Sequence, residues 1–229
     1  MASQRKPDSE FGRGAKAREA LISAVLEILA KKSIDTATTR EISAKSGQNI
    51  SAIAYYFGSK EGLYLAAVER VADTIRTGLK PVLGEIERYL DVDERTAQEA
   101  IGHIRKLIRT TLGLHRQTLA FSEIIAREQL HPTSAFSILY DGALQELQTC
   151  GARLIAVAVG GDEDDREFKI RFHAILGEAL SFRMARETIM RGVGWKDFGA
   201  DQVAIVSKLI EEHVNLILTG LMAKGGKEA

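Results

Sequence analysis

Cysteine and long apolar runs are scarce in this chain of 229 residues, and each scarcity excludes a class of protein. The single cysteine, Cys150, rules out an internal disulfide framework and a cysteine-rich zinc site, and it is compatible with a reducing compartment. No apolar stretch approaches the roughly 18 residues that a membrane span requires. The polar N-terminus lacks the apolar core of a secretory signal. We therefore expect a cytoplasmic, soluble protein with no membrane partner.

Motifs of catalysis and metal binding are also missing. The five histidines never occur at the short spacings that build a metal site on one helix face. The sequence contains no nucleophile elbow, phosphate-binding glycine loop or dinucleotide fingerprint, and the Gly160-Gly161 pair lacks the flanking strand that such a loop needs. These absences predict a protein that is not an enzyme and that uses no metal and no cofactor.

Net charge is zero, but the charges are unevenly placed. Residues 1–60 carry ten Lys/Arg against six Asp/Glu, whereas the remainder carries 21 against 25. A basic front end on a slightly acidic body fits nucleic-acid contact near the N-terminus.

Only three prolines occur, among many Ala, Leu, Ile, Glu and Arg, and no segment alternates with period two. This pattern predicts an all-α fold without a sheet. Apolar residues three and four apart predict helices over residues 15–32, 40–45, 49–57, 63–90 with a kink or break near Gly78 and Pro81, 94–116, 117–130, 134–159, 166–190 and 200–223.

The first three helices form the most informative stretch. Hydroxyl residues from Thr36 to Thr39 offer N-caps for the second helix. Gly47 is placed to adopt the positive φ of a tight turn, and Gln48 or Asn49 can cap the third helix. Two short helices joined by a glycine turn and preceded by a longer helix predict a helix-turn-helix. We expect its core to contain Ile42, Ile53, Phe57 and Leu63.

The first turn of the third helix is the end that enters the DNA major groove in helix-turn-helix proteins. This turn predicts base contacts by five residues, namely Gln48, Asn49, Ile50, Ser51 and Ala52. Two alternatives stay open, in which Asn49 only caps the helix and Ile50 packs against the core.

Four further residues are candidates for phosphate contacts, which give affinity and register but little sequence reading. Thr39 begins the second helix, where the dipole is positive, and its alternative role is the N-cap. Tyr55, Tyr56 and Lys60 flank the groove in this arrangement. Two adjacent tyrosines cannot both face the core of a helix, so at least one of them is expected to be exposed.

Residues Ala15 to Tyr64 resemble the DNA-binding domain of TetR/AcrR-type bacterial transcriptional regulators. The likeness rests on Thr38-Thr39-Arg40-Glu41-Ile42, on Ser46-Gly47 at the turn, and on the run from Tyr55 to Leu63. Residues 119–221 are similar to the C-terminal domain of the CerR/CecR-like branch, through Arg127-Glu128 followed by Pro132 and through Trp195 with Phe198. Ala54 departs from the pattern, because the family has Tyr, or Asn in this branch, at a position that often touches a phosphate.

The resemblance implies a domain plan and a dimer. We expect a disordered basic arm (1–13), the helix-turn-helix domain (14–62) and a larger helical domain for effector binding and dimerisation (63–229). The family pairs its last two helices with a second copy, here residues 167–190 and 201–222. The interface expected on the last helix comprises Val203, Val206, Ile210, His213, Ile217 and Leu221.

The same resemblance implies a small-molecule effector. Pocket candidates are Phe121, Arg127, Tyr140, Phe172, His173 and Phe182. An aromatic residue at helical spacing is more often core, and an Arg127–Glu128 ion pair competes with a ligand clamp. The implied function is that of a homodimeric repressor of a pseudo-palindromic double-stranded operator, released by the effector. Alternatives are an activator, a ligand-independent DNA-binding regulator and a helical protein-interaction module.

Overall fold

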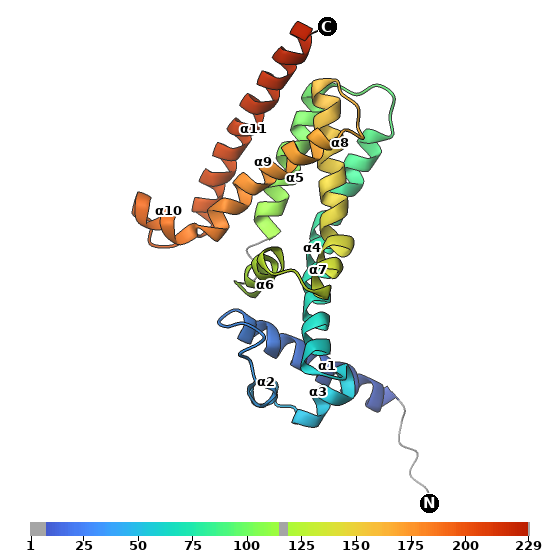
Figure 1. Ribbon diagram of the computed structural model, residues 1–229, viewed down its shortest axis with the longest axis vertical. Helices are drawn as coiled ribbons and strands as arrows, with labels where there is room; N and C mark the ends of the chain where they lie inside the picture. The colour runs from blue at the N-terminus through green and yellow to red at the C-terminus, as the bar shows by residue number, and fades with distance from the viewer. Residues whose placement is uncertain (1–7, 115–118, 229) are drawn as a thin grey trace, which may run out of the picture. The chain divides into compact units, whose positions relative to one another are not determined.

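The computed structural model describes residues 8–114 and 119–228, and within these ranges it contains helices and no strand (Figure 1). The expected all-α class is confirmed. In chain order the elements are α1 (Asp8–Leu29), α2 (Thr39–Ser46), α3 (Ile50–Phe57), α4 (Lys60–Leu90), α5 (Ala97–Leu114), α6 (Leu119–Leu130), α7 (Ser134–Leu139), the π-helical turn η1 (Tyr140–Leu144), α8 (Gln145–Val159), α9 (Arg166–Met184), α10 (Arg186–Val193) and α11 (Ala200–Glu228). None of the described helices combines the length and apolar character needed to cross a membrane.

The chain packs as two units that do not follow the expected division at residue 62. Unit 1 comprises residues 1–73 together with 118–142, and unit 2 comprises 74–117 together with 143–229. The start of α4 and the whole of α6 and α7 therefore belong with the N-terminal helices. Two contacts across unit 1 account for this, since α6 packs along α1 and the Tyr64 hydroxyl donates to Glu128 Oε1 at 2.6 Å.

Unit 1 is built on the long helix α1, whose apolar stripe includes Leu21, Ile22 and Val25, all buried. α2 and α3 pack against this stripe. The expected disordered arm is wrong for its second half, because α1 already begins at Asp8. Acidic residues in a first turn favour helix formation there, and the chain has Asp8 and Glu10 at this place. Residues 1–7 of the expected arm lie outside the described residues.

α4 runs as one helix of 31 residues and passes through Pro81 without ending, where the sequence predicted a kink or break. Leu79, Val82 and Ile86 around the proline are all buried. Burial of these side chains offsets the backbone hydrogen bond that proline cannot donate.

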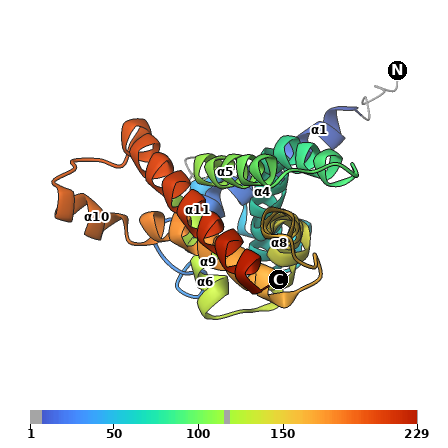
Figure 2. The ribbon, with the colours of Figure 1, turned by 90° about the horizontal axis from the view of Figure 1, so that it is seen from above.

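Unit 2 packs α5, α8, α9 and α11 against one another, and Figure 2 shows α11 crossing this group. Two helices expected to be continuous are interrupted. The helix expected over 134–159 contains the π-helical turn η1 between α7 and α8. The helix expected over 166–190 ends at Met184, and Ala185 separates it from α10.

Candidate nucleic-acid interface

Helix α2 is fixed at its N-terminus by a reciprocal pair of hydrogen bonds. The Glu41 backbone N–H donates to Thr38 Oγ1 at 3.2 Å, and the Thr38 N–H donates to Glu41 Oε2 at 2.9 Å. Thr38 is thus the N-cap, so the alternative capping role weighed for Thr39 is wrong. The Thr-x-x-Glu spacing is the sequence signal that identifies this capping box. Thr39, the first helical residue, is half-exposed beside it.

The turn between α2 and α3 has the conformation that the sequence predicted. Gly47 adopts φ 67°, in the left-handed region that glycine enters without strain. The hydroxyl of Ser43 donates to the Gln48 carbonyl, and the Gln48 N–H donates to the Ser46 hydroxyl at 3.3 Å. Side chains of α2 therefore set where the backbone enters α3.

α3 turns one face outward and anchors the other. Ile53 is buried against the core, whereas Ile50 is 50% exposed and Tyr55 is 81% exposed. Ser51 and Ala54 are exposed on the same side. Because residues three and four apart share a helix face, these four form one continuous outward surface. Half of Ile50 is covered, which leaves room for the partial core packing weighed from the sequence and exposes the other half.

Asn49 has the extended backbone of an N-cap, but its side chain makes no capping hydrogen bond. The alternative in which this side chain serves only as a cap is therefore not what the structure shows. An exposed amide at the start of α3 is left able to donate and accept beyond the protein.

The remaining candidates, Gln48 before α3 and Ala52 and Tyr56 on it, are less exposed than the outward face. Gln48, Ala52 and Tyr56 are half-buried. The Tyr56 ring packs edge-on against Tyr55, with ring centres 4.8 Å apart. Of the four expected core residues, Ile42, Ile53 and Leu63 are buried, and Phe57 is half-buried under the Arg18 guanidinium at 5.2 Å.

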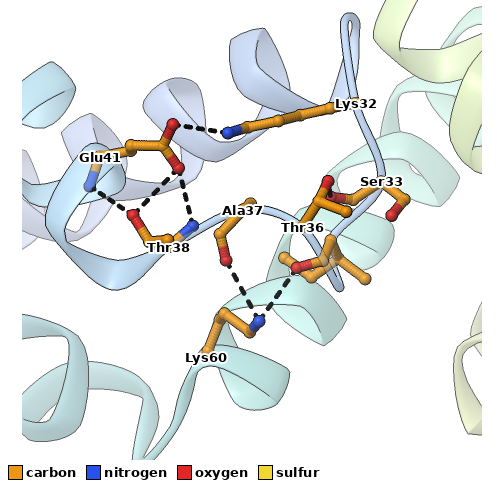
Figure 3. A network of polar contacts seen from close by, with 8 residues as sticks. Lys32, Ser33, Thr36, Ala37, Thr38, Glu41 and Lys60 are labelled. Atoms are coloured by element: carbon orange, nitrogen blue, oxygen red, sulfur yellow. Dashed lines mark hydrogen bonds and ion pairs between the residues drawn. The ribbon is translucent and has the colours of Figure 1, made fainter.

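Lys60 has a role that its sequence position did not reveal. Figure 3 shows its ammonium reaching the loop between α1 and α2, where it donates to the carbonyls of Ile34 at 3.0 Å and Ala37 at 3.2 Å. A lysine ammonium has three donors, so these two bonds leave one for a phosphate oxygen. Lys60 thus holds the α1–α2 loop, and a phosphate contact would be an addition to that role.

Glu41 joins the same network from the other side of the loop. Lys32 Nζ donates to Glu41 Oε1 at 2.5 Å. This hydrogen bond and those from Thr38 lower the pKa of Glu41 from 4.5 to about 2. The folded protein therefore favours the charged carboxylate. The stabilisation is present above pH 4.5 and is lost as the pH falls from 4.5 towards 2.

Substituting Glu41 by glutamine is expected to flatten the decline of stability between pH 4.5 and 2, because the variant has no carboxylate to protonate. In the unsubstituted chain, carbon-detected NMR titration of Glu41 should give a pKa well below 4.5. Lys32→Met should raise that pKa, since the Lys32 hydrogen bond is its largest cause. An unsubstituted Glu41 that titrates at its ordinary value would contradict the network.

The expected pocket residues are divided between the two units. In unit 1, Phe121 is buried, Tyr140 is exposed, and Arg127 Nη2 donates to Asp35 Oδ2 at 2.8 Å. The Arg127–Glu128 ion pair weighed from the sequence is thus replaced by a pair with Asp35. Neighbouring helical residues point about 100° apart, and Glu128 turns inward to Tyr64 and Thr133.

In unit 2, Phe172 is fully buried and its ring packs onto Gly151, where a β-carbon would lie 2.2 Å away. His173 is exposed beside Gln148, and Phe182 is half-buried. Phe172 is therefore a core residue, as expected for most aromatic residues at helical spacing. Three of the six candidates thus belong to unit 1 and three to unit 2.

The interface stripe expected on α11 needs correction. Val206 and Ile210 are buried inside unit 2, so neither is available to a second copy. Val203, His213 and Leu221 are half-buried, and only Ile217 of the six is an exposed apolar residue. A helix turns about 100° per residue, and the large apolar residues exposed on α11 are accordingly Ile205, Leu209, Leu216, Ile217 and Met222.

Comparison with known proteins agrees with this geometry. Residues 21–67 match the family model of bacterial regulatory proteins of the tetR family, and residues 100–221 match the C-terminal domain of the HTH-type transcriptional dual regulator CecR. The chain is 37% identical over 211 residues to that dual regulator from Shigella flexneri, covering 91% of this chain and 94% of the relative.

Two solved structures share the fold. A Clostridium perfringens protein described as a fatty acid metabolism regulator has a TM-score of 0.59 at 17% identity, over 85% of this chain and 96% of its own. A TetR/AcrR-type transcriptional regulator from Aquifex aeolicus has a TM-score of 0.53 at 14% identity, over 88% of this chain and 99% of its own. At these identities the likeness is one of fold.

Proposed function

This chain belongs to the TetR family of bacterial transcriptional regulators, which bind DNA, and from that premise we propose that it is a homodimeric repressor. It reads a pseudo-palindromic operator with α3 and is released by a small-molecule effector. The outward face of α3 carries this proposal. That face presents Ile50, Ser51 and Tyr55, and the exposed Asn49 side chain, which makes no capping hydrogen bond, precedes it. The hydrogen bond from Ser43 of α2 to Gln48 sets where this helix starts. Because bacterial DNA lies in the cytoplasm, we propose that the protein acts there.

The roles divide along the helix. Gln48, Asn49, Ile50, Ser51 and Ala52 read bases, with Asn49 and Ser51 as donors and acceptors and Ile50 as an apolar partner for a thymine methyl. Tyr55, Tyr56, Thr39 and the remaining donor of Lys60 hold phosphates. Ala54 lies in the middle of the outward face, so a larger residue there would have reached the DNA backbone.

Substituting Asn49 by alanine is expected to relax the preference at one base position of each half-site. A good amide–base pairing contributes about 1–3 kcal/mol, so discrimination there should fall about 5- to 150-fold. Substituting Tyr55 by phenylalanine removes only a hydroxyl, and it should weaken all sequences alike by about 2- to 10-fold. Binding to a library of operator variants, made from the promoter region of the chain's own gene, measures both effects.

The unsubstituted chain should bind that promoter fragment with an affinity that falls steeply with salt. Absence of binding at low salt to any upstream fragment would leave the helical interaction module as the better interpretation. If Asn49→Ala weakened every operator variant equally, α3 would not be the reading helix.

A second candidate function is activation at some promoters. The Shigella flexneri relative is described as a dual regulator, and it aligns over nearly the whole chain. A reporter under the native promoter separates the two, because deletion of the gene raises expression from a repressed promoter and lowers it from an activated one.

A further inference from the structure

We propose that unit 1 contains a binding site for a small organic acid anion, at a cleft that includes one of the expected pocket residues, Arg127, and none of the other five. The site is a cleft of about 240 Å³ between the end of α1 with the loop after it (residues 29–34), Tyr64 of α4, and Glu123, Ile124 and Arg127 of α6. Below, this is the α1–α6 cleft. Every lining residue belongs to unit 1.

The volume of the α1–α6 cleft limits what fits. A water molecule occupies about 30 Å³ of the liquid, so the cleft has room for about eight waters. Pockets for drug-sized ligands start at about 300 Å³. The cleft therefore suits a single ring or a short chain bearing one charged group.

The lining is cationic. Lys31, Lys32 and Arg127 contribute positive charges, and Glu123 contributes the one acidic side chain of the lining. Arg127 and Lys32 have carboxylate partners outside the lining, Asp35 and Glu41. Both of these carboxylates are exposed. Because exposed ion pairs contribute little net stability, a ligand carboxylate can replace Asp35 as the partner of Arg127 at small cost.

Arg127 also has an unfulfilled hydrogen-bond donor. Its Nη2 donates to Asp35, but its Nε is buried and has no partner among the described residues. A buried donor without an acceptor is costly to leave. The guanidinium edge formed by Nε and one Nη matches the two oxygens of a carboxylate, so a ligand that turns Arg127 away from Asp35 and into the cleft would satisfy the orphan donor.

The other walls are apolar. Leu29, Ile34 and Ile124 line the α1–α6 cleft and are almost completely buried. The little surface that they present to the cleft is hydrocarbon, which favours an apolar ring over a second polar group there. The combination of an arginine edge and aliphatic walls selects an aromatic or short aliphatic carboxylate over inorganic phosphate.

Occupancy would be felt by the reading helices, a consequence that rests on the proposed operator binding through α3. Lys32 both lines the cleft and pairs with Glu41 at the cap of α2, and the Ile34 carbonyl accepts a hydrogen bond from Lys60 (Figure 3). A ligand that draws Lys32 away from Glu41 loosens the start of α2, against which α3 is positioned. The two binding events are then coupled, and each weakens the other.

The test is calorimetric titration of the full chain, without DNA, with benzoate and its neutral isostere benzamide, in low-salt buffer free of carboxylate and phosphate. Benzoate should saturate one site per chain, and benzamide should bind at least about tenfold more weakly because it cannot pair with the guanidinium. Inorganic phosphate should also bind more weakly, since it has no apolar part to place against Leu29, Ile34 and Ile124.

Two surface substitutions should change benzoate affinity in opposite directions without disturbing the fold. Glu123 and Lys31 are both exposed. Glu123→Gln removes the repelling carboxylate and should tighten benzoate binding about 3- to 10-fold, whereas Lys31→Gln should weaken it by a similar factor. Lys208→Gln, at an exposed residue of unit 2, is the matched control and should change nothing. Unsaturable benzoate binding, or the same sign for both cleft variants, would overturn the site.

Operator binding supplies the second readout. Saturating benzoate should weaken operator affinity, and Lys31→Gln should reduce that effect. Unchanged operator affinity despite saturable benzoate binding would refute the coupling and leave the site standing. Failure of the chain to bind its promoter without benzoate would count against the proposed function instead.

Discussion

Substituting Glu128 by alanine is expected to lower the free energy of unfolding by about 3–5 kcal/mol, because it removes three hydrogen bonds of about 1 kcal/mol each and leaves a cavity at a buried position. Glu128 is a fully buried acidic residue, with 0% of its surface exposed. It accepts hydrogen bonds from the Tyr64 hydroxyl at 2.6 Å, from the Thr133 N–H at 3.0 Å and from the Thr133 hydroxyl at 2.9 Å. Alanine removes the acceptor of all three donors, and the buried Tyr64 hydroxyl cannot replace it with water as the exposed Thr133 can.

Graded variants test this assignment. Tyr64→Phe deletes a single donor and should cost about 1–2 kcal/mol. Glu128→Gln keeps one carbonyl oxygen and should fall between the two. Urea unfolding followed by circular dichroism measures the loss, and hydrogen exchange shows whether it is concentrated in α6, α7 and the first turns of α4. A Glu128→Ala chain as stable as the unsubstituted one would show that Glu128 does not hold these helices together.

The Tyr64 phenol reports on the same contact. The pKa of Tyr64 is raised above its ordinary value of 10, mainly by burial and next by the hydrogen bond to Glu128. Tyr64 in the folded chain therefore stays protonated, and continues to donate to Glu128, as the pH rises through 10. Loss of Glu128 removes the second of these two causes.

Substituting Leu216 by glutamate is expected to convert the proposed dimer to a monomer and to weaken operator binding by about 100-fold or more. Leu216 is 71% exposed on α11, in line with the exposed Ile205 and Leu209. An exposed apolar stripe of this kind marks an association surface. Two tethered reading helices bind about 10²–10⁴ times more tightly than one, and a monomer loses this advantage.

Sedimentation and operator binding measure the two effects on the same sample. Val92→Glu is the control, because Val92 is also a half-exposed apolar residue but lies in the loop between α4 and α5. This control should remain dimeric with unchanged affinity. If Leu216→Glu stayed dimeric at micromolar concentration, the second copy would have to bind elsewhere than this stripe.

The helix-turn-helix was predictable because its determinants are close together in sequence. Gly47 adopts a positive φ, and Ile42 and Ile53 are buried, as the spacing predicted. The two residues of the Thr38–Glu41 capping box are three positions apart, so the local sequence is enough to predict it. The family resemblance extended this interpretation to the fold, because the motif from Thr38 to Leu63 is specific.

Partners far apart in sequence were not predictable in the same way. Arg127 was paired with its neighbour Glu128 from the sequence, yet it meets Asp35, 92 residues away, because adjacent helical side chains diverge. Lys60 was assigned to DNA phosphates, and the structure uses two of its donors on the loop between α1 and α2. Each partner depends on how α1, α4 and α6 pack.

The sequence by itself therefore determined the all-helical class, the helix-turn-helix and the family, since helical period, capping and turn chemistry act over a few residues. Tertiary structure alone decided the division into two units, the inward register of Val206 and Ile210, and the grouping of Lys31, Lys32 and Arg127 around one cleft. These features depend on which helix faces meet, and a helix rotated by a single residue turns its stripe about 100° to new neighbours.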